Sequence, residues 1–215
     1  MSEIVIKICG LTNPGDARVC AEMGVHMLGL NFSPQSARRI TVKRAEEVIG
    51  AVRDDFPRLK LIGLFVDQPI DFVQNATEML ELDGVQLHGA ETPEFVRRVR
   101  APFVIKALRV TADFSLTNPY DCDAILLDTW NPDQAGGTGE TFDWSIAARL
   151  RPEIDRLILA GGLRPENVSE AIWAVRPFGV DVCSGVENAP GRKSEDKLRR
   201  FVEAVRASEK AETSA

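Results

Sequence analysis

The chain has 215 residues, of which 44% are hydrophobic and 27% are charged, as in an ordinary globular protein. This length suits one domain with a large buried core. The formal net charge is −6, and no cluster of basic residues is interleaved with aromatic residues, which argues against a nucleic-acid-binding protein.

The termini, the cysteines and the histidines bear on the setting of the protein. The N-terminus lacks a basic segment followed by a long apolar run, and no segment has the apolar length of a membrane span, so neither secretion nor membrane insertion is expected. The four cysteines form no C-x-x-C pair, which favours a reduced, cytoplasmic setting. The two histidines, His26 and His88, stand in no metal-binding pattern, so we expect no metal site.

Short apolar runs alternate with amphipathic segments along the whole chain. The apolar runs predict strands at 4–9, 26–32, 60–66, 84–88, 103–108, 124–128, 157–160 and 180–183. The amphipathic segments predict helices at 13–23, 42–54, 70–82, 93–100, 143–150, 165–175 and 195–207, whereas 111–120 is poorly patterned.

This alternation predicts an α/β fold, namely a single-domain (β/α)8 TIM barrel over residues 1–207 followed by a disordered tail, 208–215. The alternative is an open doubly wound sheet, which usually carries a G-x-G-x-x-G turn after its first strand. The first turn here reads Cys9-Gly10-Leu11-Thr12-Asn13-Pro14 instead, so the barrel is favoured.

Polar side chains gather near the C-terminal ends of the expected strands, on the face that points into a barrel. Because successive side chains point to opposite faces of a strand, Cys9, His88, Asp128 and Asp181 are all expected on the inner face. The C-terminal end of the strands is where barrel enzymes have their active sites.

Two of these residues could move protons. Cys9 could act as a base or a nucleophile if positive surroundings lower the pKa of its thiol, and Lys7, on the same face, is a source of such a field. The alternative for Cys9 is a small buried core residue. Asp128 precedes the glycine-rich loop 129–141 and could transfer a proton, or it could cap or anchor that loop.

Three further residues are candidates for binding a ligand. Arg38, in the segment after the second strand, could hold a carboxylate through two parallel hydrogen bonds or could be a solvated surface residue, and Arg39 is its rival. His88 could contact a ligand or could be a core histidine. Asp181 could orient the backbone or a substrate hydroxyl, or could make a structural hydrogen bond.

Glycine turns follow the last two expected strands, at Gly161-Gly162 and Ser184-Gly185. Such turns bring bare N–H groups close to an anion, and paired turns of this kind form the phosphate site of many barrels. Pro165 suits the first position of the following helix, and residues 185–191 could form a short extra helix that points its positive end at the same phosphate.

Taken together, these residues resemble the phosphoribosylanthranilate isomerase family over roughly residues 3 to 205. The resemblance rests on motifs that occur in the family's order at the expected strand ends. They are Lys7-Ile8-Cys9-Gly10-Leu11-Thr12, Ser36-Ala37-Arg38, Gly84-Val85-Gln86-Leu87-His88-Gly89, Asp128 with Gly136-Gly137-Thr138-Gly139, Phe142-Asp143-Trp144, Leu159-Ala160-Gly161-Gly162-Leu163 and Val180-Asp181-Val182-Cys183-Ser184-Gly185-Val186-Glu187.

The resemblance implies an aldose–ketose isomerase of tryptophan biosynthesis that performs an Amadori rearrangement without cofactor or metal. It implies Asp128 as general acid, Cys9 as general base, Arg38 as the site of the anthranilate carboxylate, and the two glycine turns as the phosphate site. The ligand would be a small phosphoribosyl compound, and the protein a monomer or a homodimer.

The chain departs from the family's usual pattern at two positions. Alanine stands at 37 where proline is usual, which would make the Arg38 loop less rigid, and Cys183 stands where the first of two serines is usual. The alternatives are another phosphosugar barrel enzyme, such as a lyase that makes indole-glycerol phosphate, or a barrel that binds phosphorylated metabolites without catalysis. The lyase would need a lysine–glutamate constellation, and the presence of both proton-transfer groups speaks against a silent barrel.

Overall fold

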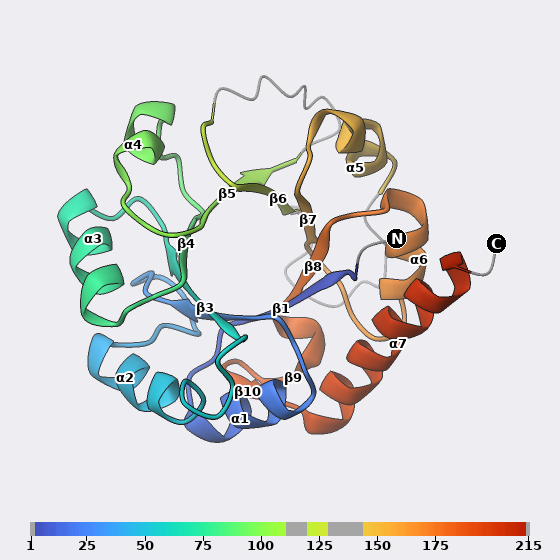
Figure 1. Ribbon diagram of the computed structural model, residues 1–215, viewed down its shortest axis with the longest axis horizontal. Helices are drawn as coiled ribbons and strands as arrows, with labels where there is room; N and C mark the ends of the chain where they lie inside the picture. The colour runs from blue at the N-terminus through green and yellow to red at the C-terminus, as the bar shows by residue number, and fades with distance from the viewer. Residues whose placement is uncertain (1–2, 111–119, 129–143, 214–215) are drawn as a thin grey trace.

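The computed structural model of the chain describes residues 3–110, 120–128 and 144–213. Eight parallel strands pair in chain order, and β8 pairs with β1 to close a barrel. Figure 1 looks along this barrel and shows helices arranged around the ring of strands. The prediction of a (β/α)8 barrel is therefore confirmed.

Each barrel strand lies within one residue of the range predicted from its apolar run. The strands are β1 Val5–Cys9, β2 Met27–Asn31, β3 Lys60–Phe65, β4 Gly84–Leu87, β5 Val104–Arg109, β6 Ala124–Asp128, β7 Leu157–Ala160 and β8 Gly179–Val182.

Side-chain caps fix the start of several helices. The side chains of Asn13, Thr41 and Thr92 each accept a hydrogen bond from the backbone amide three residues on, which satisfies a donor that the first helical turn leaves unpaired. The helices are α1 Pro14–Glu22, α2 Val42–Gly50, α3 Ile70–Met79, α4 Pro93–Arg98, α5 Ser145–Leu150, α6 Val168–Val175 and α7 Glu195–Thr213, with a 3₁₀ turn η1 at Arg151–Glu153.

Several helices differ from the prediction: α2 ends at Gly50 and not at 54, and α3 ends at Met79 and not at 82. Helix α6 begins at Val168, so Pro165 lies in a turn and is not the first helical residue. Asn167 accepts a hydrogen bond from the amide of Arg164 and donates one to the carbonyl of Gly162, which closes that turn before the helix starts. The poorly patterned segment 111–119 lies outside the described residues.

Helix α7 extends to Thr213, whereas the sequence predicted that residues 208–215 form a disordered tail. The hydroxyl of Ser208 is buried and donates to the carbonyl of Ala204, and Glu209 accepts a hydrogen bond from the backbone amide of Ile4. Glu209 therefore attaches the end of α7 to the barrel. No helix among the described residues is long and apolar enough to cross a membrane.

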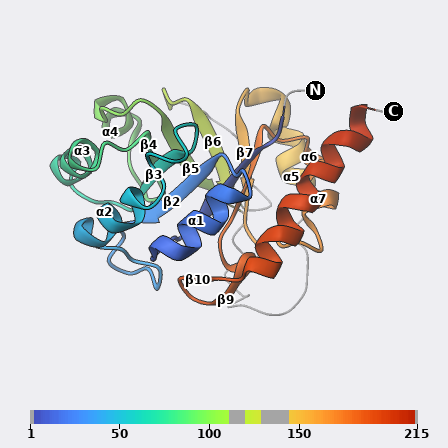
Figure 2. The same ribbon diagram turned by 60° about the horizontal axis from the view of Figure 1, so that its bottom comes forward.

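The barrel interior is divided between apolar and polar side chains. The inner faces of β5, β6 and β7 contribute most of an apolar cluster, whereas β1, β4 and β8 contribute the buried polar residues Lys7, Gln86 and Asp181. After β8 the chain forms a 3₁₀ turn η2 (Ser184–Val186) and a small hairpin of β9 (Glu187–Ala189) and β10 (Arg192–Lys193). Figure 2 shows this hairpin at the end of the barrel opposite the N-terminus, which is the C-terminal end of the strands.

Candidate active site

The proposed proton-transfer residues lie at the same end of the barrel. Cys9 is the last residue of β1, Asp128 is the last residue of β6, and His88 follows the last residue of β4. Because the strands are parallel, their C-terminal ends form one rim. This rim is the candidate active site.

The Cys9 thiol is buried and hydrogen-bonded to a second thiol. The hydrogen bond with Cys183 lowers the pKa of Cys9 from 9.0 to about 6, and the charge of Lys7 acts in the same direction against the effect of burial. The same hydrogen bond raises the pKa of Cys183. The pair therefore favours the proton on Cys183 and the thiolate on Cys9.

A buried ion pair lies beneath this thiolate. The amine of Lys7 is 3.0 Å from a carboxylate oxygen of Asp181, and both side chains are buried. Burial disfavours the charge on Lys7, but Asp181 and then the Cys9 sulfur keep its pKa above 10.5. A Cβ added at Gly29 would lie 2.9 Å from the Cys9 sulfur and 3.1 Å from the Lys7 amine, so this glycine leaves the space in which the two groups meet.

Asp128 is hydrogen-bonded to a histidine that is itself oriented by a glutamine. The Nε2 atom of His88 lies 3.0 Å from a carboxylate oxygen of Asp128, and the Gln86 amide nitrogen lies 2.9 Å from His88 Nδ1. Gln86 and Asp128 therefore engage both ring nitrogens of His88. The arrangement holds the Asp128 carboxyl group in place.

Arg38 lies in an ordered loop although Ala37 replaces the usual proline. The amide of Arg38 donates to the Ser36 hydroxyl at 3.1 Å, and the amide of Ile40 donates to the carbonyl of Asn31 at 2.8 Å. These hydrogen bonds, and not a proline ring, set the backbone here. The rival Arg39 is exposed, whereas the Arg38 side chain is only 26% exposed.

Two residues that the sequence did not single out complete this side of the rim. Glu187 accepts hydrogen bonds from the Arg38 guanidinium, the Lys193 amine and the backbone amide of Gly191. Lys193 also donates to the carbonyl oxygen of Cys183. Arg38 lies in the loop after β2, whereas Glu187 and Lys193 lie in the hairpin after β8. The sequence motif contains Glu187, but it could not indicate which residues Glu187 contacts.

The two glycine turns differ in shape and lie against each other. Gly161 and Gly162 have φ values of 86° and 64°, in the left-handed region that glycine adopts without a steric penalty. Ser184 and Gly185 lie in η2, and a Cβ added at Gly185 would overlap the carbonyl oxygen of Leu163. The short extra helix predicted over 185–191 is limited to this one turn, because the chain then enters the β9–β10 hairpin.

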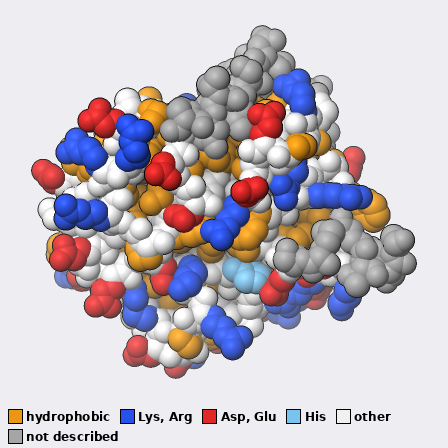
Figure 3. Space-filling model, turned by 45° about the horizontal axis from the view of Figure 1, so that its top comes forward, with side chains coloured by type: hydrophobic (Ala, Val, Ile, Leu, Met, Phe, Trp, Pro, Cys, Tyr) orange, Lys and Arg blue, Asp and Glu red, His pale blue; other side chains and the backbone are white. Residues whose placement is uncertain are grey.

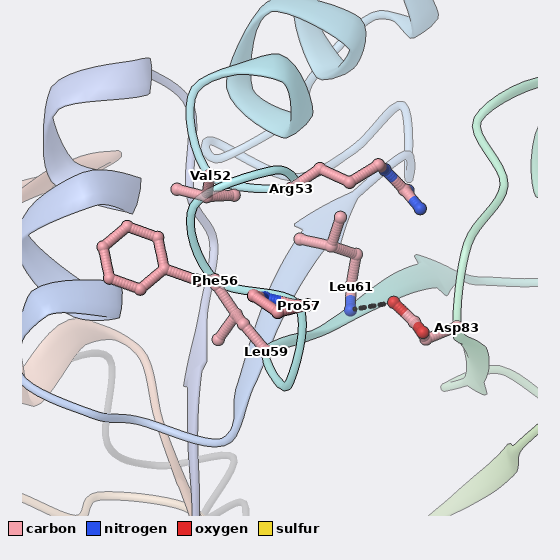
Figure 4. Close-up of a pocket in the computed structure, with 7 residues that line it drawn as sticks. All are labelled: Val52, Arg53, Phe56, Pro57, Leu59, Leu61 and Asp83. Carbon is pink, nitrogen blue, oxygen red and sulfur yellow. Dashed lines mark hydrogen bonds between the residues drawn. The ribbon is translucent and has the colours of Figure 1, made fainter.

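A pocket among the described residues lies away from the rim and has no comparable chemistry. A shallow pocket of about 170 Å³ lies at the opposite end of β3, where Asp83 accepts a hydrogen bond from the amide of Leu61 (Figure 4). Its other lining residues include the apolar Val52, Phe56 and Leu59. Figure 3 shows acidic and basic side chains interspersed on one face of the molecule, without a large patch of one sign. Within the described residues, no group of three or more His, Cys, Asp or Glu side chains could hold a metal ion.

Comparison with known proteins relates this geometry to one family. The family model described as N-(5'phosphoribosyl)anthranilate (PRA) isomerase matches residues 6–204. An N-(5'-phosphoribosyl)anthranilate isomerase of Pelobacter propionicus is 44% identical over 201 residues, which covers 93% of this chain and 94% of that relative.

Solved structures give the same result. A phosphoribosyl anthranilate isomerase from Thermotoga maritima superposes with a TM-score of 0.85 at 36% identity and covers 95% of this chain and 99% of its own. A phosphoribosyl anthranilate isomerase in complex with reduced 1-(o-carboxyphenylamino)-1-deoxyribulose 5-phosphate has a TM-score of 0.81 at 34% identity, over 95% of this chain and 99% of its own. The chain therefore belongs to the N-(5'-phosphoribosyl)anthranilate isomerase family.

Proposed function

We propose that the chain isomerises N-(5-phosphoribosyl)anthranilate to 1-(2-carboxyphenylamino)-1-deoxyribulose 5-phosphate with Cys9 as the base and Asp128 as the acid. The observation that carries this assignment is a thiol of lowered pKa and a histidine-linked carboxyl group at one rim of the barrel. As a member of its family, the chain is an isomerase of tryptophan biosynthesis. The roles of its individual residues are the content of the proposal.

The first step opens the ribose ring. Asp128 in its protonated form gives its proton to the ring oxygen, the bond between that oxygen and C1′ breaks, and the lone pair of the anthranilate nitrogen forms an imine. His88 faces the same carboxyl group through Nε2, so it holds the acid in position.

The second step moves the proton that makes the product. The Cys9 thiolate removes the hydrogen on C2′, and the imine accepts the electron pair, which gives an enolamine. In the tautomerisation to the ketose, C1′ gains the proton that the Cys9 thiol carries and the 2′-hydroxyl gives its proton to the Asp128 carboxylate, which restores both groups. A thiolate suits this step because its pKa of about 6 leaves it ionised at neutral pH.

The other candidates would bind and orient the substrate. Arg38 would hold the anthranilate carboxylate, and the turns at Gly161-Gly162 and Ser184-Gly185 would hold the phosphate through backbone N–H groups. The side chains of His88 and Asp181 are bonded to Asp128 and Lys7, which favours roles beside those residues. Direct contact of His88 or Asp181 with the substrate stays a prediction.

Loss of substrate fluorescence tests the assignment. Cys9→Ser and Asp128→Asn should each reduce kcat by about 10²–10⁴-fold, the usual contribution of a positioned acid or base. Cys122→Ser, which changes a thiol on the turn before β6, should leave kcat unchanged. Turnover at the wild-type rate in either active-site variant would remove that residue from the mechanism.

The class of ligand, the oligomeric state and the location of the protein are proposed from its relatives and its sequence, and not from individual residues. One solved relative is described in complex with a reduced phosphorylated sugar derivative, and we expect a small phosphoribosyl compound to bind here as well. Another solved structure is described as monomers generated from a dimeric isomerase of Thermotoga maritima. A monomeric or homodimeric state and a cytoplasmic location stay predictions, which size-exclusion chromatography and cell fractionation would test.

A further inference from the structure

We infer that Glu187 is a positioning residue that holds the Arg38 guanidinium ready for the carboxylate of the substrate, an inference that rests on the proposed function. Glu187 begins β9, and Arg38 lies in the loop after β2, so their contact joins two loops that are 149 residues apart in the chain. The Glu187 side chain is only 4% exposed and is therefore fixed from several sides.

The contact uses one edge of the guanidinium. Arg38 Nε and Nη2 lie 3.1 Å and 2.7 Å from the same Glu187 oxygen, Oε2. A guanidinium has a second edge, formed by the outer hydrogens of Nη1 and Nη2, which matches the two oxygens of a carboxylate. Within the described part of the chain, Nη1 has no hydrogen-bond partner, so this outer edge is the one left for a ligand.

The stem of Arg38 is fixed as well as its charged end. A Cβ added at Gly10 would lie 3.1 Å from Arg38 Cγ and 3.0 Å from the Cys183 sulfur, so the stem packs against the residue that follows Cys9. The guanidinium is therefore held at its base by Gly10 and at its tip by Glu187. A carboxylate that binds the outer edge would be placed next to the proposed base.

Glu187 is one anion between two cations, so the charge balance favours binding of a second anion. Its Oε1 accepts from the Lys193 amine at 3.0 Å, while Oε2 accepts from Arg38, so one carboxylate faces two cations. Burial opposes ionisation of Glu187, but Arg38 and Lys193 outweigh burial and keep its pKa below the ordinary value. Glu187 balances only one of these two cations, and the open edge of Arg38 is where a substrate carboxylate can meet the remaining charge.

The test must separate the loss of Arg38 positioning from the cost of leaving Lys193 buried without a partner. The single variant Lys193→Met keeps the Glu187–Arg38 contact, and the double variant Lys193→Met/Glu187→Gln removes the buried charges of both residues. Comparing the two isolates what Glu187 does for Arg38, because neither variant leaves a lone buried charge. Circular dichroism and thermal melting check that both fold.

The measurement is KM and kcat for N-(5-phosphoribosyl)anthranilate and for its analogue without the carboxylate, N-(5-phosphoribosyl)aniline. We expect the double variant to raise KM for the anthranilate substrate by about 10–100-fold over Lys193→Met, as for a lost charged hydrogen bond. The KM for the aniline analogue should be equal in the two variants. The variant Lys193→Met/Glu187→Asp, which keeps a carboxylate at position 187, should have a lower KM for the anthranilate substrate than Lys193→Met/Glu187→Gln.

The outcomes that overturn the inference differ from those that overturn the proposed function. Equal KM for the anthranilate substrate in the single and double variants would remove Glu187 from the positioning of Arg38. An equal rise for both substrates would show a general structural role. An unchanged KM in Arg38→Met would exclude Arg38 from substrate binding and the inference with it. Absence of turnover in the wild-type protein would instead contradict the proposed function.

Discussion

The ionisation of Cys9 depends on Cys183, a residue that is unusual at its position in the family. The hydrogen bond with Cys183 is the largest influence on the Cys9 thiol, ahead of burial and of the Lys7 charge. A thiol at 183, where the family usually has serine, therefore helps to set the pH range in which Cys9 is ionised.

The pH dependence of turnover should report this hydrogen bond. Because the base is needed as a thiolate, kcat/KM should fall as the pH drops below about 6. Cys183→Ala should move this acid limb to higher pH, because the lost hydrogen bond lets the pKa of Cys9 rise towards 9.0. Cys183→Ser keeps a donor and should move it less. A profile that stays the same in Cys183→Ala would show that the two thiols are not coupled.

The buried ion pair of Lys7 and Asp181 should be sensitive to loss of one partner. Lys7→Met leaves the Asp181 carboxylate buried without its cation, which should reduce the free energy of unfolding by about 3–5 kcal/mol. The double variant Lys7→Met/Asp181→Asn removes both charges and should be closer to the wild type. Urea unfolding measures both, and equal stability of wild type and Lys7→Met would show that the pair adds nothing.

The sequence could predict the residues at strand ends better than the residues that hold them. Cys9 and Asp128 follow apolar runs, and alternation along a strand fixes the face on which they lie. Glu187 has no such signal, because its partners Arg38 and Lys193 are brought to it by barrel closure and by the hairpin. Glu187 ends the motif that contains the Ser184-Gly185 turn, and that motif predicted a phosphate site and no contact with Arg38.

At the scale of elements, the strands were predictable because a buried strand and its apolar run have the same length. The start of α6 was not, because Pro165 is compatible with both a turn and a helix. The choice was made by Asn167, whose side chain bonds to backbone groups on both sides of that turn. The hairpin of β9 and β10 was missed because its two short strands carry polar residues and no apolar run.

The contact between the two glycine turns leads to a prediction for Gly185. Gly185→Ala would force its Cβ against the carbonyl oxygen of Leu163, so the turn after β7 or η2 must move. We expect KM for the phosphorylated substrate to rise by about tenfold or more, the effect of misplacing one charged hydrogen bond. At Gly50, where an added Cβ meets nothing within 4 Å, the same change is the matched control. A wild-type KM in Gly185→Ala would separate this turn from phosphate binding.

At the scale of the whole molecule, closure of the barrel brings the two ends of the chain together. Strands β1 and β8 pair over four residues, and α7 then returns so that Glu209 bonds to the amide of Ile4. The closed ring could be predicted from the number and order of the strands. The length of α7 could not, because its last residues are small or charged and the partner of Glu209 lies at the other end of the sequence.

The bond between Glu209 and Ile4 should contribute to thermal stability. Glu209→Ala removes an acceptor worth about 1 kcal/mol, which should lower Tm by about 2–4 °C in a domain of this size. Glu203→Ala, on an exposed position of the same helix, is the control and should leave Tm unchanged. A melting curve of Glu209→Ala that matches the wild type would show that the end of α7 is not needed to hold the N-terminal strand.

The position of the two termini has a consequence for tethering. The end of α7 lies beside the start of β1, since Glu209 bonds to the amide of Ile4, and Figure 2 shows both away from the β9–β10 hairpin. A second protein joined beyond either of these elements would be attached on the side of the barrel opposite the candidate active site. The fold is therefore suited to being linked to a neighbouring domain without covering the strand ends that carry Cys9 and Asp128.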